Sequence, residues 1–580
     1  MLKPFTPASD FAPPSLDATD WSQLQPLYQR LIEREVRSAA DLERLVLDRS
    51  ELDAAVSEAS NTLYINMTCR TDDAEVKRAY LAFVETVQPR LKEVSFELDR
   101  KVAASPFGSA LPRERFGVML RDTRTAVELF RPESIPLETE LTKLDQRYSE
   151  LTGAMTVRFR DVEHTLPQMA RYQEEPDRGV REEAWRLVAQ RRLQDREEIE
   201  SIFDQMLGLR ARVAANAGFS DFRAYSFRAK RRYDYTPEDC MRFAEGVERH
   251  VVPTLRQLNR QRREKLGLER LRPWDMGVDV LGRPPLKPFE TVPQMLDRTQ
   301  RVFRRMDPSP GGLADMLDAL AARSNGSGGE RCLDLESRKG KAPIGYQANR
   351  DRMRMPFIFM NASGVHRDVE TMVHEAGHAF HALLCRDDPL LANRSEMPLE
   401  FAEVASMSME LTSLPFLDEF YSPGDADRAR RLHMELLATL LPWVATIDQF
   451  QHWLYTHPGH TRAARREAWL AVRARFAEDA DWAGLEEIHA SMWQRQGHLF
   501  GAPFYYIEYG IAQLGALQLY GSYTRDPSGT IRRYKEALAL GASRPLPDLF
   551  AAAGLDFDFS PAKIERAWSA VERDLAQLPA

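Results

Sequence analysis

Cysteine is scarce in this sequence: only 4 of the 580 residues are Cys, and they lie far apart without forming a CxxC pair. A disulfide scaffold is therefore excluded, and the four thiols are expected to be reduced. Apolar runs are short as well, since nowhere do about 18 apolar residues follow one another, which excludes a membrane-spanning helix. The first residues, MLKPFTPASD, have no basic head before an apolar stretch. We therefore expect no signal peptide and a cytoplasmic protein.

An excess of basic residues is also missing. The sequence has 79 Lys and Arg against 87 Asp and Glu, which gives a net charge of -8 at pH 7. A surface of this sign repels a phosphate backbone, so we expect no nucleic-acid partner and no membrane partner. The fractions of apolar and charged residues, 43% and 29%, are those of an ordinary globular chain, which excludes disorder and collagen.

The secondary structure is expected to be mainly helical. Apolar residues recur at spacings of three and four among abundant Ala, Leu, Glu and Arg, which predicts amphipathic helices, including one long helix over residues 181–217 that stops at Gly218. The clearest extended segments are residues 342–346 and 353–360. Because Pro356 cannot donate a hydrogen bond, the second segment is expected to lie at or near a sheet edge and could add a substrate peptide as a further strand.

The strongest chemical signal is an HExxH motif, Val373-His-Glu-Ala-Gly-His378. Helical periodicity surrounds it, with one apolar face made by Val369, Val373, Ala376, Phe380 and Leu383. In a helix, His374 and His378 lie about 6 Å apart along the axis, so both rings can reach one zinc ion with bonds of about 2.1 Å. Glu375 is rotated by about 100° from His374, which puts its carboxylate beside the ion, where it can serve as a general base.

The third ligand must come from another part of the chain. The extended motif HExxHxxGxxH is excluded, because position 381 is His and position 384 is Leu. His381 lies about 10.5 Å along the axis from His374, too far to share an ion, and is assigned a structural or substrate-side role. A second predicted helix begins near Pro398 and offers two acids on one face, Glu403 and Glu410. Two nearby acids compete with Glu403 as ligand: Glu396 and Glu400.

The two helices together resemble the zinc oligopeptidases that include thimet oligopeptidase and oligoendopeptidase F. That family has HExGHxxH followed after some twenty residues by FxExxSxxxE, and this sequence has HEAGHAFH and FAEVASMSME. The resemblance implies one zinc ion per chain held by His374, His378 and Glu403. It also implies that Glu410 orients a ligand histidine.

A downstream segment extends the resemblance. The stretch HLFGAPFYYIEY, residues 498–509, is similar to the family's His and Tyr segment and matches the form of the oligoendopeptidase F branch. By this resemblance His498, Tyr506 and Tyr509 face the substrate and stabilise the oxyanion, with Tyr505 as the alternative. The implied fold is a mainly α, zincin-like metallopeptidase with a small sheet beside the active-site helix and a deep substrate channel. We expect residues 1–175 to form an N-terminal helical region and residues 176–580 the catalytic domain.

The implied function is zinc-dependent hydrolysis of internal bonds in short unstructured peptides, through attack by a zinc-bound water assisted by Glu375. A zinc aminopeptidase or carboxypeptidase would share the ligands, and a noncatalytic peptide-binding protein would have no need of Glu375. A second histidine group, His452, His457 and His460, surrounds a turn. No second metal site is predicted there, because no carboxylate or Cys accompanies it in the sequence.

Overall fold

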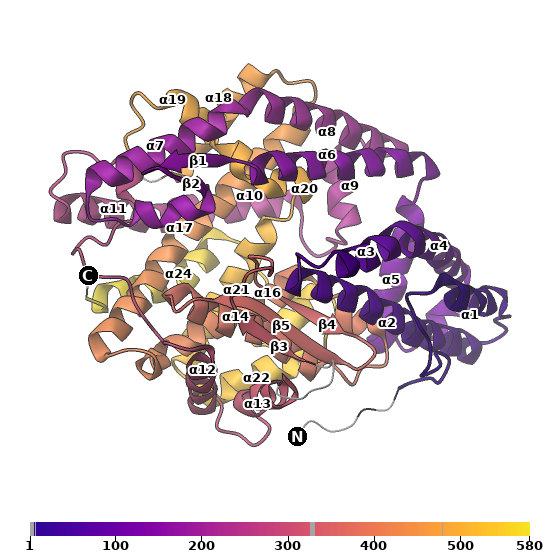
Figure 1. Ribbon diagram of the computed structural model, residues 1–580. Helices are drawn as coiled ribbons and strands as arrows, with labels where there is room; N and C mark the ends of the chain where they lie inside the picture. Colours follow the sequence, from indigo (N-terminus) through magenta and orange to yellow (C-terminus); the bar gives the residue numbers. More distant parts are fainter. Residues whose placement is uncertain (1–4, 6, 325–330, 478, 580) are drawn as a thin grey trace.

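The computed structural model describes residues 5, 7–324, 331–477 and 479–579, and over these residues it is mainly helical (Figure 1). This confirms the predicted fold class. The described residues contain two small sheets, of which one lies beside the helix that carries the HExxH motif. No helix in the described ranges combines the length and the apolar composition that a membrane span needs.

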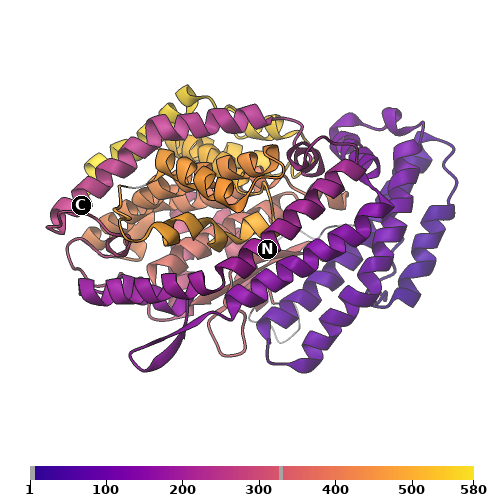
Figure 2. The same ribbon diagram turned by 90° about the horizontal axis from the view of Figure 1, so that it is seen from above.

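The N-terminal helices form one group, at the right of Figure 1 and of Figure 2. They bury a core of their own that runs from Phe11 to Leu120 and also includes Leu390. The boundary between residues 175 and 176 stays a prediction. The helices of this group are α1 (Trp21–Glu33), α2 (Ala39–Cys69), α3 (Ala74–Ala82), α4 (Gln88–Ala104) and α5 (Arg113–Leu129).

The remaining helices share a second, larger core that extends from Leu144 to Val571. Long helices α6 to α8 lie along the top of Figure 1, and the HExxH helix α14 lies in the middle of the molecule. The helices are α6 (Ile135–Gly153), α7 (Arg178–Gln194), α8 (Arg196–Asn216), α9 (Phe222–Ala229), α10 (Pro237–Gly246), α11 (Val252–Lys265), α12 (Val292–Met306), α13 (Leu313–Ser324), α14 (His366–Leu384), α15 (Leu391–Ser395), α16 (Leu399–Ser413), α17 (Pro423–Thr456), α18 (Arg462–Phe476), α19 (Glu486–Ser491), α20 (Gly497–Gly501), α21 (Ile507–Tyr523), α22 (Pro527–Leu538), α23 (Leu546–Ala552) and α24 (Pro561–Gln577).

The long helix predicted over residues 181–217 is two helices, α7 and α8, which meet at Asp195. Asp is a poor residue for a helix interior, because its carboxylate competes for local hydrogen bonds. Here that carboxylate accepts a hydrogen bond from Arg191, one turn earlier. The predicted stop at Gly218 is confirmed, since this glycine follows α8 with a φ of 85°.

The sheet beside α14 has the order β3-β5-β4, with β3 (Leu333–Glu336) parallel and β4 (Tyr346–Arg350) antiparallel to β5 (Met355–Ala362). The strand with Pro356, predicted at or near a sheet edge, is not an edge strand: β5 is the central one of the three and lies next to both edges. The proline fits because β3 pairs with β5 only from Ile358 onward, and the Ile358 N–H points to that side. The Pro356 nitrogen, two residues earlier, faces the same side where β3 has not yet begun. A second sheet is the hairpin of β1 (Thr156–Phe159) and β2 (Val162–Thr165).

Candidate metal centre

Helix α14 presents both histidines of the motif on one face. Asp368 stabilises its first turn by accepting hydrogen bonds from the N–H groups of Ser363, Gly364 and Val365. The predicted apolar face is buried in the core and fixes the rotation of the helix. His374 and His378 then lie on the opposite side with their ring centroids 4.9 Å apart, and their side chains remain 24% and 18% exposed. Solvent therefore reaches the two rings.

Helix α16 brings the third donor, the carboxylate of Glu403. Its Oε2 atom lies 3.5 Å from His374 Nε2 and 3.7 Å from His378 Nε2. Donor atoms that bind one zinc ion in a tetrahedron are roughly 3.4 to 3.8 Å apart. All three donors lie within 4.8 Å of one another, so the residues present fit a single zinc ion.

The two acids that competed with Glu403 have other partners. Glu400 is buried and accepts a hydrogen bond from the Tyr235 hydroxyl at 2.7 Å. Glu396 forms an ion pair with Arg231 at the surface, with a distance of 2.5 Å. Neither carboxylate belongs to the group of donors around His374 and His378.

Gly377 explains how α16 comes so close to α14. A Cβ atom at this position would lie 2.6 Å from the Ala405 carbonyl oxygen and 2.6 Å from Ser406 Cα, far inside normal contact. Only glycine therefore allows this separation of the two helices. On its other side α16 meets α21 at Gly515, where a Cβ atom would lie 2.7 Å from Val404 Cγ2. Helix α16 is thus held between two helices at glycine positions.

Glu410 contacts the first histidine, as the family resemblance implies. Its Oε1 atom lies 2.6 Å from His374 Nδ1, so Nδ1 donates and Nε2 is the atom that remains for a metal. Burial lowers the pKa of His374, but the hydrogen bond and the charge of Glu410 outweigh this and raise it to about 9, so metal binding would displace a proton from Nε2. Burial lowers the pKa of His378 to about 4, so this ring is neutral at pH 7 and available as a ligand.

Glu375 is buried beside the donors and is not one of them. Burial raises its pKa, and the charges of Glu403 and Glu410 raise it further. The nearby His374 partly opposes them, and the resulting pKa is about 7. A carboxyl group with such a pKa can both accept and return a proton near neutral pH.

Two further residues of the centre were not predicted from the sequence, Glu370 and His433. The Nδ1 atom of His433, on α17, lies 3.0 Å from Glu370 Oε1, and its Nε2 atom lies 3.9 Å from Glu410 Oε2. Glu370 precedes His374 by four residues on the same helix face, which is a signal that could have revealed it. His433 comes from a distant helix and has no such signal.

His381, the third histidine of HEAGHAFH, does not join the donors. Its side chain is buried against Phe401, with ring centroids 5.9 Å apart, and neither ring nitrogen has a hydrogen-bond partner among the described residues. Burial lowers the pKa of His381 to about 3, so the ring stays neutral. Its position agrees with the structural role expected for it.

The His and Tyr segment lies at α20 and the start of α21. The ring of His498 lies 5.4 Å from that of Tyr505, 5.0 Å from that of Tyr506 and 6.2 Å from that of Tyr509, measured between centroids. The structure thus brings together the four rings that the resemblance selects. Phe504 precedes them with a φ of 61°, a conformation that is uncommon for any residue other than glycine.

The three tyrosines differ in the groups that surround their hydroxyls. Burial raises the pKa of Tyr505 and of Tyr509, and the charge of Glu403 adds to both shifts. Burial also raises the pKa of Tyr506, but its polar neighbours Trp443 and Gln496, and not Glu403, act on its hydroxyl. Gln496 in turn lies 2.7 Å from His498 Nδ1. Tyr505 and Tyr509 are therefore the ones near the donors.

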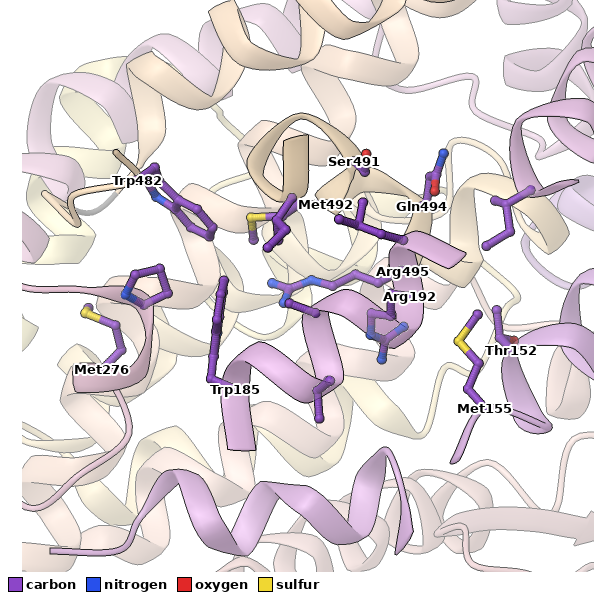
Figure 3. A pocket seen from close by; sticks show the side chains of 16 residues that line it. Thr152, Met155, Trp185, Arg192, Met276, Trp482, Ser491, Met492, Gln494 and Arg495 are labelled. Atoms are coloured by element: carbon purple, nitrogen blue, oxygen red, sulfur yellow. The ribbon is translucent and has the colours of Figure 1, made fainter. Parts of the chain in front are cut away.

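A separate cavity of about 290 Å³ lies between α7, α19 and the segment after α19 (Figure 3). Figure 3 shows Trp185 and Trp482 on one side of it and Arg192 and Arg495 in the middle. None of the predicted site residues lines this cavity, so it is distinct from the metal centre.

Comparisons with known proteins agree with this geometry. Residues 171–568 match the family described as Peptidase family M3, and residues 11–130 match the Peptidase M3 N-terminal domain. Oligopeptidase A of Haemophilus influenzae is 23% identical over 338 residues, which are 48% of this chain and 48% of that protein. The chain thus spans about half the length of this curated relative.

Solved structures match over nearly the whole chain. A crystal structure designated oligoendopeptidase F is 27% identical, with a TM-score of 0.85, and the match covers 98% of this chain and 99% of that chain. PZ peptidase A with an inhibitor is 25% identical, with a TM-score of 0.86 and the same coverage, 98% and 99%.

Proposed function

Because the chain belongs to peptidase family M3, whose members are zinc-dependent metallopeptidases, we propose that it is an oligoendopeptidase that hydrolyses internal bonds of short unstructured peptides. The observation that carries the proposal is the distance of 3.5 to 3.7 Å from Glu403 Oε2 to the Nε2 atoms of His374 and His378. Similarity over 98% of the chain to an oligoendopeptidase F and to PZ peptidase A supports the substrate class.

His374, His378 and Glu403 would hold one zinc ion per chain. Bound there, zinc would polarise the scissile carbonyl and make a water molecule acidic near neutral pH. Glu410 keeps the Nδ1 proton on His374, so that Nε2 points its lone pair at the ion. Ser406 donates a hydrogen bond to Glu403 Oε2 at 2.8 Å and thereby fixes the rotamer of that carboxylate.

Glu375 carries the proton transfers in this proposal. Its carboxylate accepts a proton from the attacking water and passes it to the nitrogen of the departing amine. Its raised pKa suits a group that both accepts and returns a proton near neutral pH.

The oxyanion would be stabilised by tyrosine hydroxyls. Tyr509 and Tyr505 are the candidates, because the charge of Glu403 acts on both. Tyr509 comes first, because the family resemblance selects it and gives Tyr505 only as the alternative. Tyr506, whose hydroxyl has Trp443 and Gln496 as its polar neighbours, would position His498 and the other rings. Such donors act on charge that develops only in the transition state.

An extended substrate would pair with the outer edge of β4 and not with β5, which has a strand on each side. Gly345, just before β4, lies next to the catalytic centre: a Cβ atom there would be 3.9 Å from Glu375 Oε1. Backbone pairing at this edge would hold peptides of varied sequence, because main-chain groups supply the hydrogen bonds.

A cavity of about 750 Å³ at the N-terminus of α14 is our candidate for holding the peptide on one side of the scissile bond, although no residue of the metal centre lines it. His366 lies at its edge, and its other walls come from α11, α17 and the loop 276–286. His366 lies eight residues before His374, which is roughly 12 Å along the helix. An extended peptide spans this distance with about four residues.

The carboxypeptidase alternative has one observation in its favour. Arginines line the same cavity, among them Arg262, Arg428 and Arg431, and could bind a terminal carboxylate. A carboxypeptidase would shorten peptides with a free C-terminus and spare peptides whose C-terminus is an amide. An endopeptidase would cut both internally.

The test is mass spectrometry of a mixed library of short peptides, half of them amidated, after incubation with the enzyme. We expect internal cleavage of both halves, which a chelator abolishes and added zinc restores. Glu375→Gln should retain zinc and lose at least 10²- to 10⁴-fold in turnover, whereas Glu396→Gln, a matched change one turn before α16, should behave as wild type. Cleavage confined to free termini, or full turnover by Glu375→Gln, would contradict the proposal.

A further inference from the structure

A second group of metal-binding side chains is buried where α10 meets α17. It consists of Cys240 on α10 and of Asp448 and His452 on α17, with the Sγ, carboxylate and ring donor atoms all within 4.8 Å of one another. The three residues are only 1%, 1% and 4% exposed. Of the two histidines that accompany His452 in the sequence, His457 is exposed and His460 is half-buried, and neither belongs to this group. The fold thus supplies the carboxylate and the Cys that the sequence did not show beside His452.

Asp448 and His452 are spaced like the histidines of the first centre, four residues apart on one helix face. The distance from His452 Nε2 to Asp448 Oδ2 is 3.3 Å. Zinc bonds of about 2.0 to 2.3 Å place tetrahedral donors roughly 3.4 to 3.8 Å apart. The pair is within about 0.1 Å of this separation, and the thiol needs a shift of at most about 1 Å to complete the set.

Within the described part of the chain, the oxygens of Asp448 and the ring nitrogens of His452 are not taken up by other hydrogen bonds. Neither carboxylate oxygen of Asp448 and neither ring nitrogen of His452 has a hydrogen-bond partner. Aromatic rings cover the histidine instead: the ring centroid of Phe504 is 5.3 Å away and that of Phe227 is 6.0 Å away. A carboxylate in such surroundings is strongly unfavourable unless a cation balances it.

We propose that Cys240, Asp448 and His452 bind a divalent metal ion of the zinc class, separate from the catalytic one. A thiolate and a carboxylate together balance the two positive charges of the ion, so the buried group becomes neutral. The mixed sulfur, nitrogen and oxygen donors suit zinc or cobalt(II) and do not suit calcium or magnesium, which take oxygen ligands. Binding releases the proton of the thiol.

The ion would hold the segment that carries the tyrosines. Phe504, whose ring lies against His452, has the left-handed backbone conformation described above. Its N–H donates to Oε1 of Gln451, the neighbour of His452, at 2.5 Å, and its carbonyl oxygen accepts from Arg232. A metal ion that fixes His452 would therefore also fix Phe504, the residue directly before the tyrosine segment 505–509.

Cobalt(II) substitution tests the site in the whole protein. Dialysis to remove metal and titration with cobalt(II) should give two equivalents per chain, and one of them should produce a thiolate-to-cobalt charge-transfer band in the near ultraviolet. The donor set of the catalytic centre contains no Cys, so this band reports on the second site alone. Elemental analysis of the zinc-loaded enzyme should likewise find two ions.

Single-residue variants identify the side chain that gives the charge-transfer band, and they distinguish this second metal site from the proposed catalytic one. Cys240→Ser should lose the band and one equivalent, while Cys385→Ser, an equally buried thiol outside the group, should keep both. Glu403→Ala should lose the other equivalent and keep the band. One equivalent without a thiolate band in the wild-type protein would overturn the proposal, whether or not the Cys240 variant folds, and would leave the catalytic centre untouched.

Discussion

Replacement of Gly377 by Ala tests whether the metal centre depends on the close contact of α14 with α16. The new Cβ would lie 2.6 Å from the Ala405 oxygen and from Ser406 Cα, whereas ordinary contact begins near 3.4 Å. The two helices must therefore separate by about 0.8 Å. Glu403 is on the same turn of α16 as Ala405 and Ser406, so it moves with them.

The effect on metal binding follows from the donor distances. A shift of about 0.8 Å away from α14 would lengthen the distances from Glu403 Oε2 to His374 and His378 from 3.5 and 3.7 Å to about 4.3 and 4.5 Å. Metal sites tolerate deviations of only about 0.2 Å in bond length. We expect zinc affinity to fall by at least the 10- to 100-fold typical of changes in the residues that support metal ligands.

The effect on stability is smaller. Overpacking costs about 1 to 3 kcal/mol, and replacing a helical glycine by Ala returns about 0.5 to 1 kcal/mol. The net loss should thus be at most about 2.5 kcal/mol, so the variant folds and its zinc affinity can be measured by competition with a chromogenic chelator.

Gly208→Ala is the matched control, because Gly208 is also helical, on α8, and a Cβ there meets nothing within 4 Å. It should bind zinc as the wild type does and melt at the same temperature or slightly higher. If Gly377→Ala bound zinc as tightly as Gly208→Ala, the close contact would not control the centre.

Three further predictions concern single side chains. Glu403→Ala should lose most of the catalytic zinc in elemental analysis after gel filtration, and retention of that ion with normal activity would exclude Glu403 as a ligand. Glu410→Ala should weaken zinc binding by about 10- to 100-fold in chelator competition, and Glu410→Gln, which keeps an acceptor for the His374 N–H, should weaken it less. Tyr509→Phe should lower kcat by about 10²- to 10³-fold with little change in KM on a quenched-fluorescence peptide, and Tyr506→Phe should have a smaller effect; equal kinetics for both variants and the wild type would refute the oxyanion role.

Local spacing explains why the first metal centre could be predicted. His374, His378 and Glu375 follow from the helical repeat alone, since no other part of the chain decides which way they face. Glu403 needed the family resemblance, because the repeat left Glu396 and Glu400 as alternatives. In the structure both alternatives have other partners: Glu400 accepts a hydrogen bond from Tyr235, and Glu396 forms an ion pair with Arg231.

Features that depend on tertiary packing were missed. The position of β5 in its sheet depends on where β3 begins, and the residues around Pro356 carry no information about that. His433 and Cys240 meet their partners only because α17 crosses helices that are distant in sequence. The break at Asp195 was missed for a different reason, since the apolar repeat continues through a residue that ends one helix and precedes the next.

The position of α16 between two glycines has a consequence for motion. Contacts at Gly377 and Gly515 leave no space for this helix to slide against α14 or α21. The proposed zinc ligands of α14 and α16 and the tyrosines at the start of α21 are therefore expected to move as one rigid block. Any opening that admits a peptide would therefore need its hinge outside these three helices, and the proposed catalytic groups would keep their mutual distances.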